Sequence, residues 1–129
     1  MTEAMLKSAL MRYLRKKHPS AVILRHEDRI TAGIPDVSVT WDGSTSWWEV
    51  KYAKSRIRTR GIQELTCLRL ARQGLCYYLI YEERDAFHKR TRIVTPVELQ
   101  QGLDGELHDG FDHAFVAQFI SRLHHDRRK

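Results

Sequence analysis

Hydrophobic and polar positions repeat with two different periods along this chain, and each period predicts a different kind of element. From residue 2 to residue 17, apolar side chains recur every three to four positions, which is the spacing of an amphipathic helix. The segments 36–41 and 46–52 instead alternate in steps of two, which is typical of strands with one buried face. The intervening Asp42-Gly43-Ser44-Thr45 is a hairpin signal, so we expect these two strands to pair.

The rest of the chain continues with further strands and helices. Short apolar runs predict strands over residues 21–25, 75–81 and 90–94, and helical spacing predicts helices over residues 60–73 and 112–125. Thr95 followed by Pro96 predicts the start of one more short helix, because these residue types favour the N-cap and the first helical position. The segment 102–110 contains three glycines among polar residues, and we expect a surface loop there.

In chain order, the expected elements are a helix, three strands, a helix and a strand, followed by a short strand and helices. This order predicts an α/β fold with a central mixed sheet flanked by helices. With 129 residues and an apolar fraction of 42%, the chain is long enough for one domain, spanning residues 1–129, with a sizeable core. It contains no apolar run of the roughly 18 residues that a membrane span needs, and its first residues do not resemble a signal peptide. We therefore expect a cytoplasmic protein without a membrane partner.

The charge of the chain favours a polyanionic partner. Lysine and arginine outnumber the acidic residues by 22 to 16, which gives a formal net charge of +6. Net charge alone is weak support for nucleic-acid binding, because many basic proteins bind none. Its distribution is more informative, since five cations fall within ten residues that contain no acid: Lys51, Lys54, Arg56, Arg58 and Arg60.

Cysteine and histidine residues show no pattern of a structural zinc site. Cys67 and Cys76 are not part of a CxxC motif, and we expect both to be buried free thiols. We expect His124 and His125 to lie on the surface of the last helix.

Two carboxylates and an ammonium come together at the predicted hairpin. If its turn has two residues, Asp36 lies directly opposite Glu49; if the turn has four residues, Asp36 lies opposite Lys51. Because side chains alternate along a strand, either turn places all three side chains on one face of the sheet. The alternative interpretation is an exposed aspartate beside an ordinary cross-strand pairing of Glu49 with Lys51, since short D…ExK spacings also occur by chance.

Such a pair of carboxylates is suited to a divalent cation. Two neighbouring carboxylates repel each other when both are ionised, and a bound cation removes that repulsion. Oxygen ligands suit Mg²⁺ or Mn²⁺, which polarise a phosphoryl oxygen and lower the pKa of a bound water. Lys51 can stabilise the charge on the phosphate or orient the attacking water.

These residues resemble a known motif. Pro35-Asp36 and Glu49-Val50-Lys51 are similar to the motif of the PD-(D/E)xK nuclease superfamily, and the expected element order resembles its restriction-endonuclease-like core. Within that superfamily, Gly33-Ile34-Pro35-Asp36, Trp48-Glu49-Val50-Lys51 and the later Gln63 most resemble the VRR-NUC group of virus-type replication-repair nucleases. The resemblance covers about residues 2–83, and it implies nothing about the C-terminal additions over residues 84–129.

The resemblance implies a role for each matching residue. Asp36 and Glu49 would bind Mg²⁺ or Mn²⁺ together with the carbonyl of Val50. Lys51 would be the catalytic lysine, and Gln63 would lie near the site to help hold metal-bound water or substrate.

A further acid is implied on the first helix, where Glu3 is the candidate. An acid in the first turn is also favoured by the helix dipole without any catalytic role. Glu27 is a rival, because it follows the first expected strand and precedes the turn that leads to Asp36. The cations that follow the motif would contact DNA phosphates: Lys54, Arg56, Arg58 and Arg60.

We therefore expect a metal-dependent endonuclease that hydrolyses DNA in a bacterial or phage-infected cell. By resemblance, branched DNA such as junctions or flaps is the expected substrate. A homodimer is expected because one small domain offers one site whereas a duplex has two strands. The chain lacks a glycine-rich phosphate loop, so no nucleotide cofactor is expected. The alternatives are a non-catalytic nucleic-acid-binding module with the same fold and an interaction domain whose basic segment binds an acidic protein.

Overall fold

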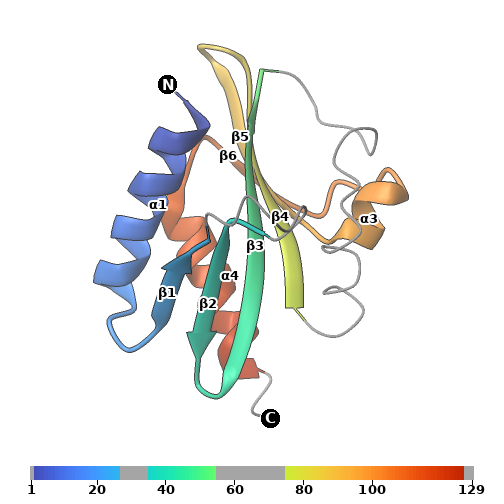
Figure 1. Cartoon of the computed structure of the whole chain (residues 1–129). Coiled ribbons are helices and arrows are strands. Elements are labelled where there is room, and N and C mark those ends of the chain that lie inside the picture. Colours follow the sequence, from blue (N-terminus) through green and yellow to red (C-terminus); the bar gives the residue numbers. More distant parts are fainter. Residues whose placement is uncertain (1, 27–34, 55–74, 127–129) are drawn as a thin grey trace.

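A six-stranded sheet with helices on both faces makes up the computed structural model of the protein (Figure 1). The structure describes residues 2–26, 35–54 and 75–126. Its strands are β1 (Val22–Arg25), β2 (Val37–Trp41), β3 (Ser44–Ala53), β4 (Leu75–Asp85), β5 (His88–Val94) and β6 (Glu106–Asp109), and its helices are α1 (Glu3–Lys17), α3 (Pro96–Gln100) and α4 (His113–Asp126).

The strands lie in the order of the sequence, from β1 to β6. Only the pairing between β3 and β4 is parallel, and the other four pairings between described neighbours are antiparallel. The predicted α/β class with a mixed sheet flanked by helices is therefore confirmed. The expected helix over residues 60–73 and Cys67 lie outside the described residues.

Helix α1 begins and ends where the sequence predicts. The Oγ1 of Thr2 accepts a hydrogen bond from the backbone N–H of Met5 at 3.1 Å, which satisfies one free donor of the first turn. Three basic residues in the last turn, Arg15, Lys16 and Lys17, lie at the negative end of the helix dipole. The helix ends at Lys17, with His18 as its C-cap before a proline.

The β2–β3 hairpin has the two-residue turn. Asp42 and Gly43 both have positive φ angles, 51° and 79°, and Trp41 pairs with Ser44. This left-handed turn matches the twist of paired strands, and glycine adopts it without steric cost. The pairing continues to Val37 and Trp48. One step further, the same register sets Asp36 opposite Glu49, which selects the first of the two alternatives.

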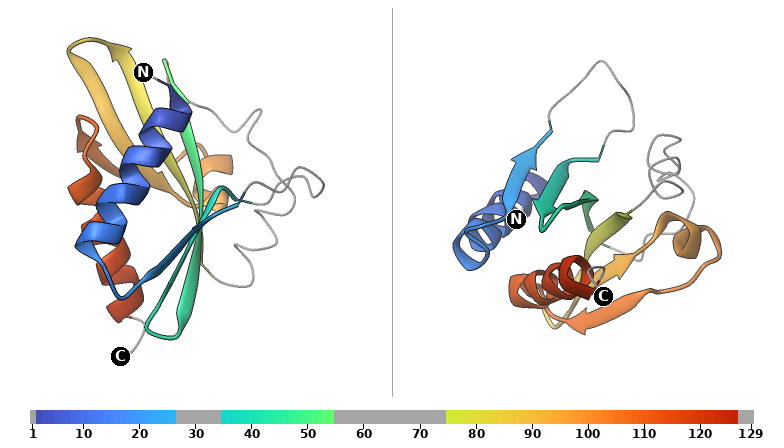
Figure 2. Two further views of the ribbon diagram at one scale, coloured as in Figure 1. Left: turned by 60° about the vertical axis from the view of Figure 1, so that its left-hand side comes forward. Right: turned by 90° about the horizontal axis from the view of Figure 1, so that it is seen from below.

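One face of the sheet carries the larger core, against α1 and α4 (Figure 2). Alternate residues of the inner strands point into it and are fully buried, including Val39, Val50 and Leu79. Leu10 of α1 and Ile120 of α4 pack against them. This alternation follows from the period of two in the sequence.

The opposite face carries a smaller core beneath α3. Tyr78 and Ile80 of β4 pack there with Leu99 of α3, and Trp47 of β3 lies against them. The capping box of α3 is present, with Thr95 and Glu98 each bonding the other's backbone N–H. Because β3 alternates, the side chains on the Trp47 side of the strand also include Glu49 and Lys51.

Two expectations for the C-terminal part need correction. The segment 102–110 is not only a loop, because Glu106–Asp109 forms β6 and pairs with β5. All four of its residues are exposed, so the strand has no buried alternation for the sequence to reveal. After residue 83, the strand expected over residues 90–94 is present as β5, and β6 adds a strand where helical additions were expected.

His124 is buried, and its expected surface position is wrong. Its side chain is 0% exposed and bonds the hydroxyls of Ser44 and Ser46 at 2.8 and 2.9 Å. The expectation failed because these partners lie about 80 residues earlier in the chain, beyond any local pattern. His125 is exposed as predicted, and Cys76 is buried as predicted. Within the described parts of the chain, no helix is long and apolar enough to cross a bilayer.

Candidate active site

Strand β3 extends past the residue of β3 that pairs with the first residue of β2. Along this unpaired part of its edge, backbone N–H groups of β3 donate hydrogen bonds to carboxylates. The N–H of Val50 donates to Asp36 Oδ2 at 3.0 Å, and the N–H of Tyr52 donates to Glu3 Oε1 at 3.0 Å. Because the N–H and C=O of one strand residue point to the same side, the Val50 carbonyl also faces this edge. We call the group formed by Glu3, Lys7, Asp36, Glu49 and Val50 the edge site.

Asp36 lies at the centre of the edge site. Its Oδ1 is 3.0 Å from the Nζ of Lys7, and its Oδ2 accepts from Val50. Burial raises the pKa of Asp36. Hydrogen bonds with Glu49, Lys7 and the Val50 N–H, together with the charge of Lys7, lower it, and their combined effect is larger than that of burial. The net pKa is below the usual 3.8, so this carboxylate is ionised at neutral pH.

Glu49 contacts Asp36 through a side-chain hydrogen bond and is only 7% exposed. Two carboxylates this close repel each other when both are ionised, and a bound cation removes that repulsion. Two contacting carboxyl groups are also a pair of hard oxygen ligands, and the Val50 carbonyl faces the same edge. This donor chemistry fits Mg²⁺ or Mn²⁺.

Glu3 reaches the same edge of β3 but contacts a different residue. It bonds the N–H of Tyr52, two positions beyond Val50 along the strand. Among the described residues, no group of three or more histidine, cysteine or acidic side chains is gathered closely enough to hold a metal. Glu27, the rival for the additional acid, lies outside the described residues.

Lys7 is a member of the edge site that the sequence interpretation missed. It comes from α1, one helical turn after Glu3, and the whole residue is 9% exposed. A lysine this buried normally has a counter-charge, which Asp36 supplies here. The signal was present in the sequence, because Lys7 falls on the helical stripe that also contains Leu10 and Leu14.

Lys51 shares the face of Glu49, because the two are separated by one residue of β3, and it is half-buried. Lys54 is exposed just after the strand. The remaining residues assigned by resemblance, Gln63, Arg56, Arg58 and Arg60, lie outside the described residues.

His26 also lies beside the site and was not singled out from the sequence. Its backbone N–H donates to the carbonyl of Asp36 at 2.7 Å, and its Nε2 contacts the Oγ of Ser38 at 2.7 Å. Its ring lies 5.2 Å from that of Trp47 between centroids. His26 therefore connects the end of β1 to the bend at Asp36 and fixes the backbone that carries the carboxylate.

A second charged cluster lies on β4 and β5, on the sheet face of Lys51. Glu82 bonds the Nη1 of Arg92 at 3.0 Å and the Nε of Arg90 at 2.6 Å. Arg92 is 1% exposed and also donates to the carbonyls of Leu103 and Asp104. Because these bonds tie the segment after α3 to the sheet, the cluster has a structural role.

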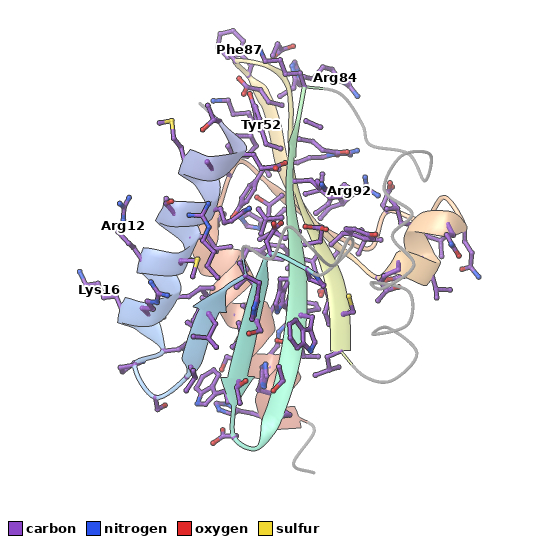
Figure 3. All side chains as sticks on the ribbon, viewed as in Figure 1. Arg12, Lys16, Tyr52, Arg84, Phe87 and Arg92 are labelled. Carbon is purple, nitrogen blue, oxygen red and sulfur yellow. The ribbon has the colours of Figure 1, made fainter. Side chains whose placement is uncertain are left out.

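Other charged side chains lie at the periphery (Figure 3). Arg12 and Lys16 point outward from α1, on the side away from the sheet. Arg84 and Phe87 lie at the tip of the β4–β5 hairpin, where Phe87 is 91% exposed.

Comparison with known families and with curated proteins gives no match to this chain.

Proposed function

We propose that this protein is a metal-dependent endonuclease that hydrolyses DNA phosphodiester bonds. The observation that carries the proposal is the contact between Asp36 and Glu49 at the open edge of β3, with Lys51 on the Glu49 face. We further propose that the sheet contains a restriction-endonuclease-like core of the PD-(D/E)xK superfamily, most similar to the VRR-NUC group. The order of α1, β1, β2, β3 and β4 is compatible with that core.

In this proposal, the carboxylates of Asp36 and Glu49 and the Val50 carbonyl hold Mg²⁺ or Mn²⁺. When bound, such an ion polarises a phosphoryl oxygen and lowers the pKa of a coordinated water. The Val50 N–H fixes the orientation of Asp36, so its carboxylate needs no rearrangement during the reaction. Lys51 supplies a positive charge for the phosphate or positions the attacking water.

DNA binding in this proposal rests on charge. The formal net charge is +6, and the exposed Lys54 begins the group of cations that follows the motif. Neutralising phosphates releases counterions, so DNA affinity should fall steeply with salt concentration. Junction, flap or other branched DNA in the bacterial or phage cytoplasm is the substrate that we propose, and a homodimer is the assembly.

The first prediction is that Glu49→Gln and Lys51→Met abolish most of the cleavage activity. Losing one charge-stabilising group at a reaction centre slows a reaction about 100-fold or more. The measurement is cleavage of single-stranded, duplex, flap and four-way-junction DNA with Mg²⁺ or Mn²⁺. Lys16→Met and Glu106→Gln are matched controls, because both residues are exposed. Cleavage by Glu49→Gln at the wild-type rate would remove the edge site from the mechanism.

A non-catalytic nucleic-acid-binding module with this fold is the second candidate. The Lys7–Asp36 ion pair favours it, because an ammonium already neutralises part of the carboxylate charge without a metal. Such a module would bind DNA in a salt-sensitive way and cleave none of the substrates with either ion. The cleavage experiment therefore separates the two candidates.

A further inference from the structure

The ammonium of Lys7 lies against Asp36, a carboxylate that the proposed function assigns to the metal. Its Nζ lies 3.0 Å from Asp36 Oδ1, and the two side chains are 11% and 23% exposed. Lys16 and Lys17 of the same helix are exposed instead. Burying an ammonium without a counter-charge is costly, so the Asp36 carboxylate is what allows Lys7 to lie this far from water.

The position of Lys7 is set by how α1 docks on the sheet. Leu6 and Leu10, on the same side of the helix, are buried in the main core. One turn before Lys7, Glu3 bonds the backbone N–H of Tyr52. Contacts on both sides along the helix therefore hold the backbone of Lys7 close to the edge of β3.

The two oxygens of Asp36 differ in how firmly their partners are held. Oδ2 accepts from the N–H of Val50, which is part of the β3 backbone and cannot move away alone. Oδ1 contacts Lys7, whose ammonium is carried on a flexible four-carbon chain. A divalent cation at Oδ1 would therefore compete with Lys7, because two cations at one oxygen repel each other.

We propose that Lys7 is an internal counter-ion that competes with the divalent cation for Asp36 and thereby sets the metal affinity of the edge site. The inference rests on the proposed function, since it requires the site to bind a metal. Lys7 is a positioning residue: it holds the Asp36 carboxylate in the metal-free protein and releases Oδ1 when the ion binds.

The test compares Mn²⁺ binding by the wild-type protein, Lys7→Met and Lys16→Met, measured by isothermal titration calorimetry at fixed ionic strength. Lys16→Met makes the same change of net charge on the same helix at an exposed position. We expect Lys7→Met to bind Mn²⁺ about tenfold tighter or more, the smallest effect that a charge at this distance has on a neighbouring ionisable group. Lys16→Met should bind like the wild type.

The sign of the change distinguishes competition from a merely structural role. If Lys7 only supported the fold, its loss would loosen the site, and Mn²⁺ affinity would fall. Unchanged or weaker binding by Lys7→Met, with wild-type binding retained, overturns this inference and leaves the nuclease proposal standing. If neither the wild type nor Lys7→Met binds Mn²⁺, both proposals fail.

A second measurement is made on the wild-type protein, and a conservative variant serves only to identify one signal. The lysine ammonium signals are followed by NMR during titration with diamagnetic Mg²⁺, and the Lys7 signal is identified by its loss in Lys7→Arg, which keeps the cation. We expect the Lys7 signal to shift as the ion binds, whereas the signals of exposed Lys16 and Lys17 stay in place. A Lys7 signal that does not respond to bound Mg²⁺ overturns the inference.

Discussion

At the scale of single residues, buried and half-buried polar side chains in this protein have specific partners. Lys7 is paired with Asp36, and His113 contacts the hydroxyl of Tyr81 at 3.0 Å through its Nδ1. Burial lowers the pKa of His113, and the nearby charge of Asp112 only partly opposes this effect. Burial also raises the pKa of Tyr81, so its hydroxyl stays protonated and can donate to the imidazole.

The lowered pKa of His113 predicts a loss of stability in mild acid. As the pH falls below the ordinary value of 6.5, the unfolded chain takes up a proton at this histidine before the folded protein does. The free energy of unfolding therefore decreases until the pH passes the lowered pKa of the folded state. Urea unfolding of the wild type and of His113→Gln at pH 5 to 8 measures how the free energy of unfolding depends on pH.

His113→Gln should show a shallower pH dependence than the wild type, because glutamine does not titrate. His88→Gln is the control, since His88 lies exposed at the β4–β5 hairpin. Parallel pH profiles for the wild type and His113→Gln would contradict the prediction.

At the scale of elements, local residue types determined the turn and the helix ends, whereas side-chain partners came from distant segments. Asp42-Gly43 was sufficient to predict the hairpin, and its two-residue turn fixed which residue faces Glu49. Nothing local indicated β6, because its four residues are exposed and the strand exists through its pairing with β5. The position of Lys7 beside Asp36 depends on how α1 docks against β3, which the pattern within α1 alone does not specify.

Gly105 lies close to β5, and this predicts that alanine substitutions at two glycines before β6 destabilise the protein to different extents. Gly102 and Gly105 both have positive φ angles, 74° and 69°. An added Cβ at Gly105 would collide with the backbone of Ile93 and Val94, whereas none would be met at Gly102. Alanine at either position costs about 1–2 kcal/mol in the left-handed conformation, and only Gly105→Ala adds the collision.

We therefore expect Gly105→Ala to lower the free energy of unfolding clearly more than Gly102→Ala does. The measurement is chemical denaturation of both variants beside the wild type. Equal destabilisation by the two variants would mean that the segment moves away from β5 without cost.

At the scale of the whole molecule, the sequence predicted the α/β class, the mixed sheet and the face shared by Glu49 and Lys51. These follow from alternation and chain order, which are encoded locally. It did not predict burial of His124, whose partners Ser44 and Ser46 lie in β3. The residues implied by resemblance on segment 55–74, including Gln63, lie outside the described residues, and their roles stay predictions.

The proposed homodimer predicts a particle of twice the chain mass. One chain has a mass of 15.2 kDa, and light scattering at the concentration used for cleavage should report about double that value. Two copies would supply one edge site for each strand of a duplex. A monomer under cleavage conditions, with both strands of the substrate cut, would contradict the dimer and leave the edge site in place.

Both outer strands of the described sheet are short. β1 and β6 have four residues each, and β6 carries acidic residues at both of its ends, Glu106 and Asp109. Short edge strands, and the acidic residues of β6, discourage strand pairing between molecules, which is the usual first step of β-aggregation. We therefore expect two copies of this chain to associate through surfaces other than a continuous sheet, and concentrated samples to resist fibril formation.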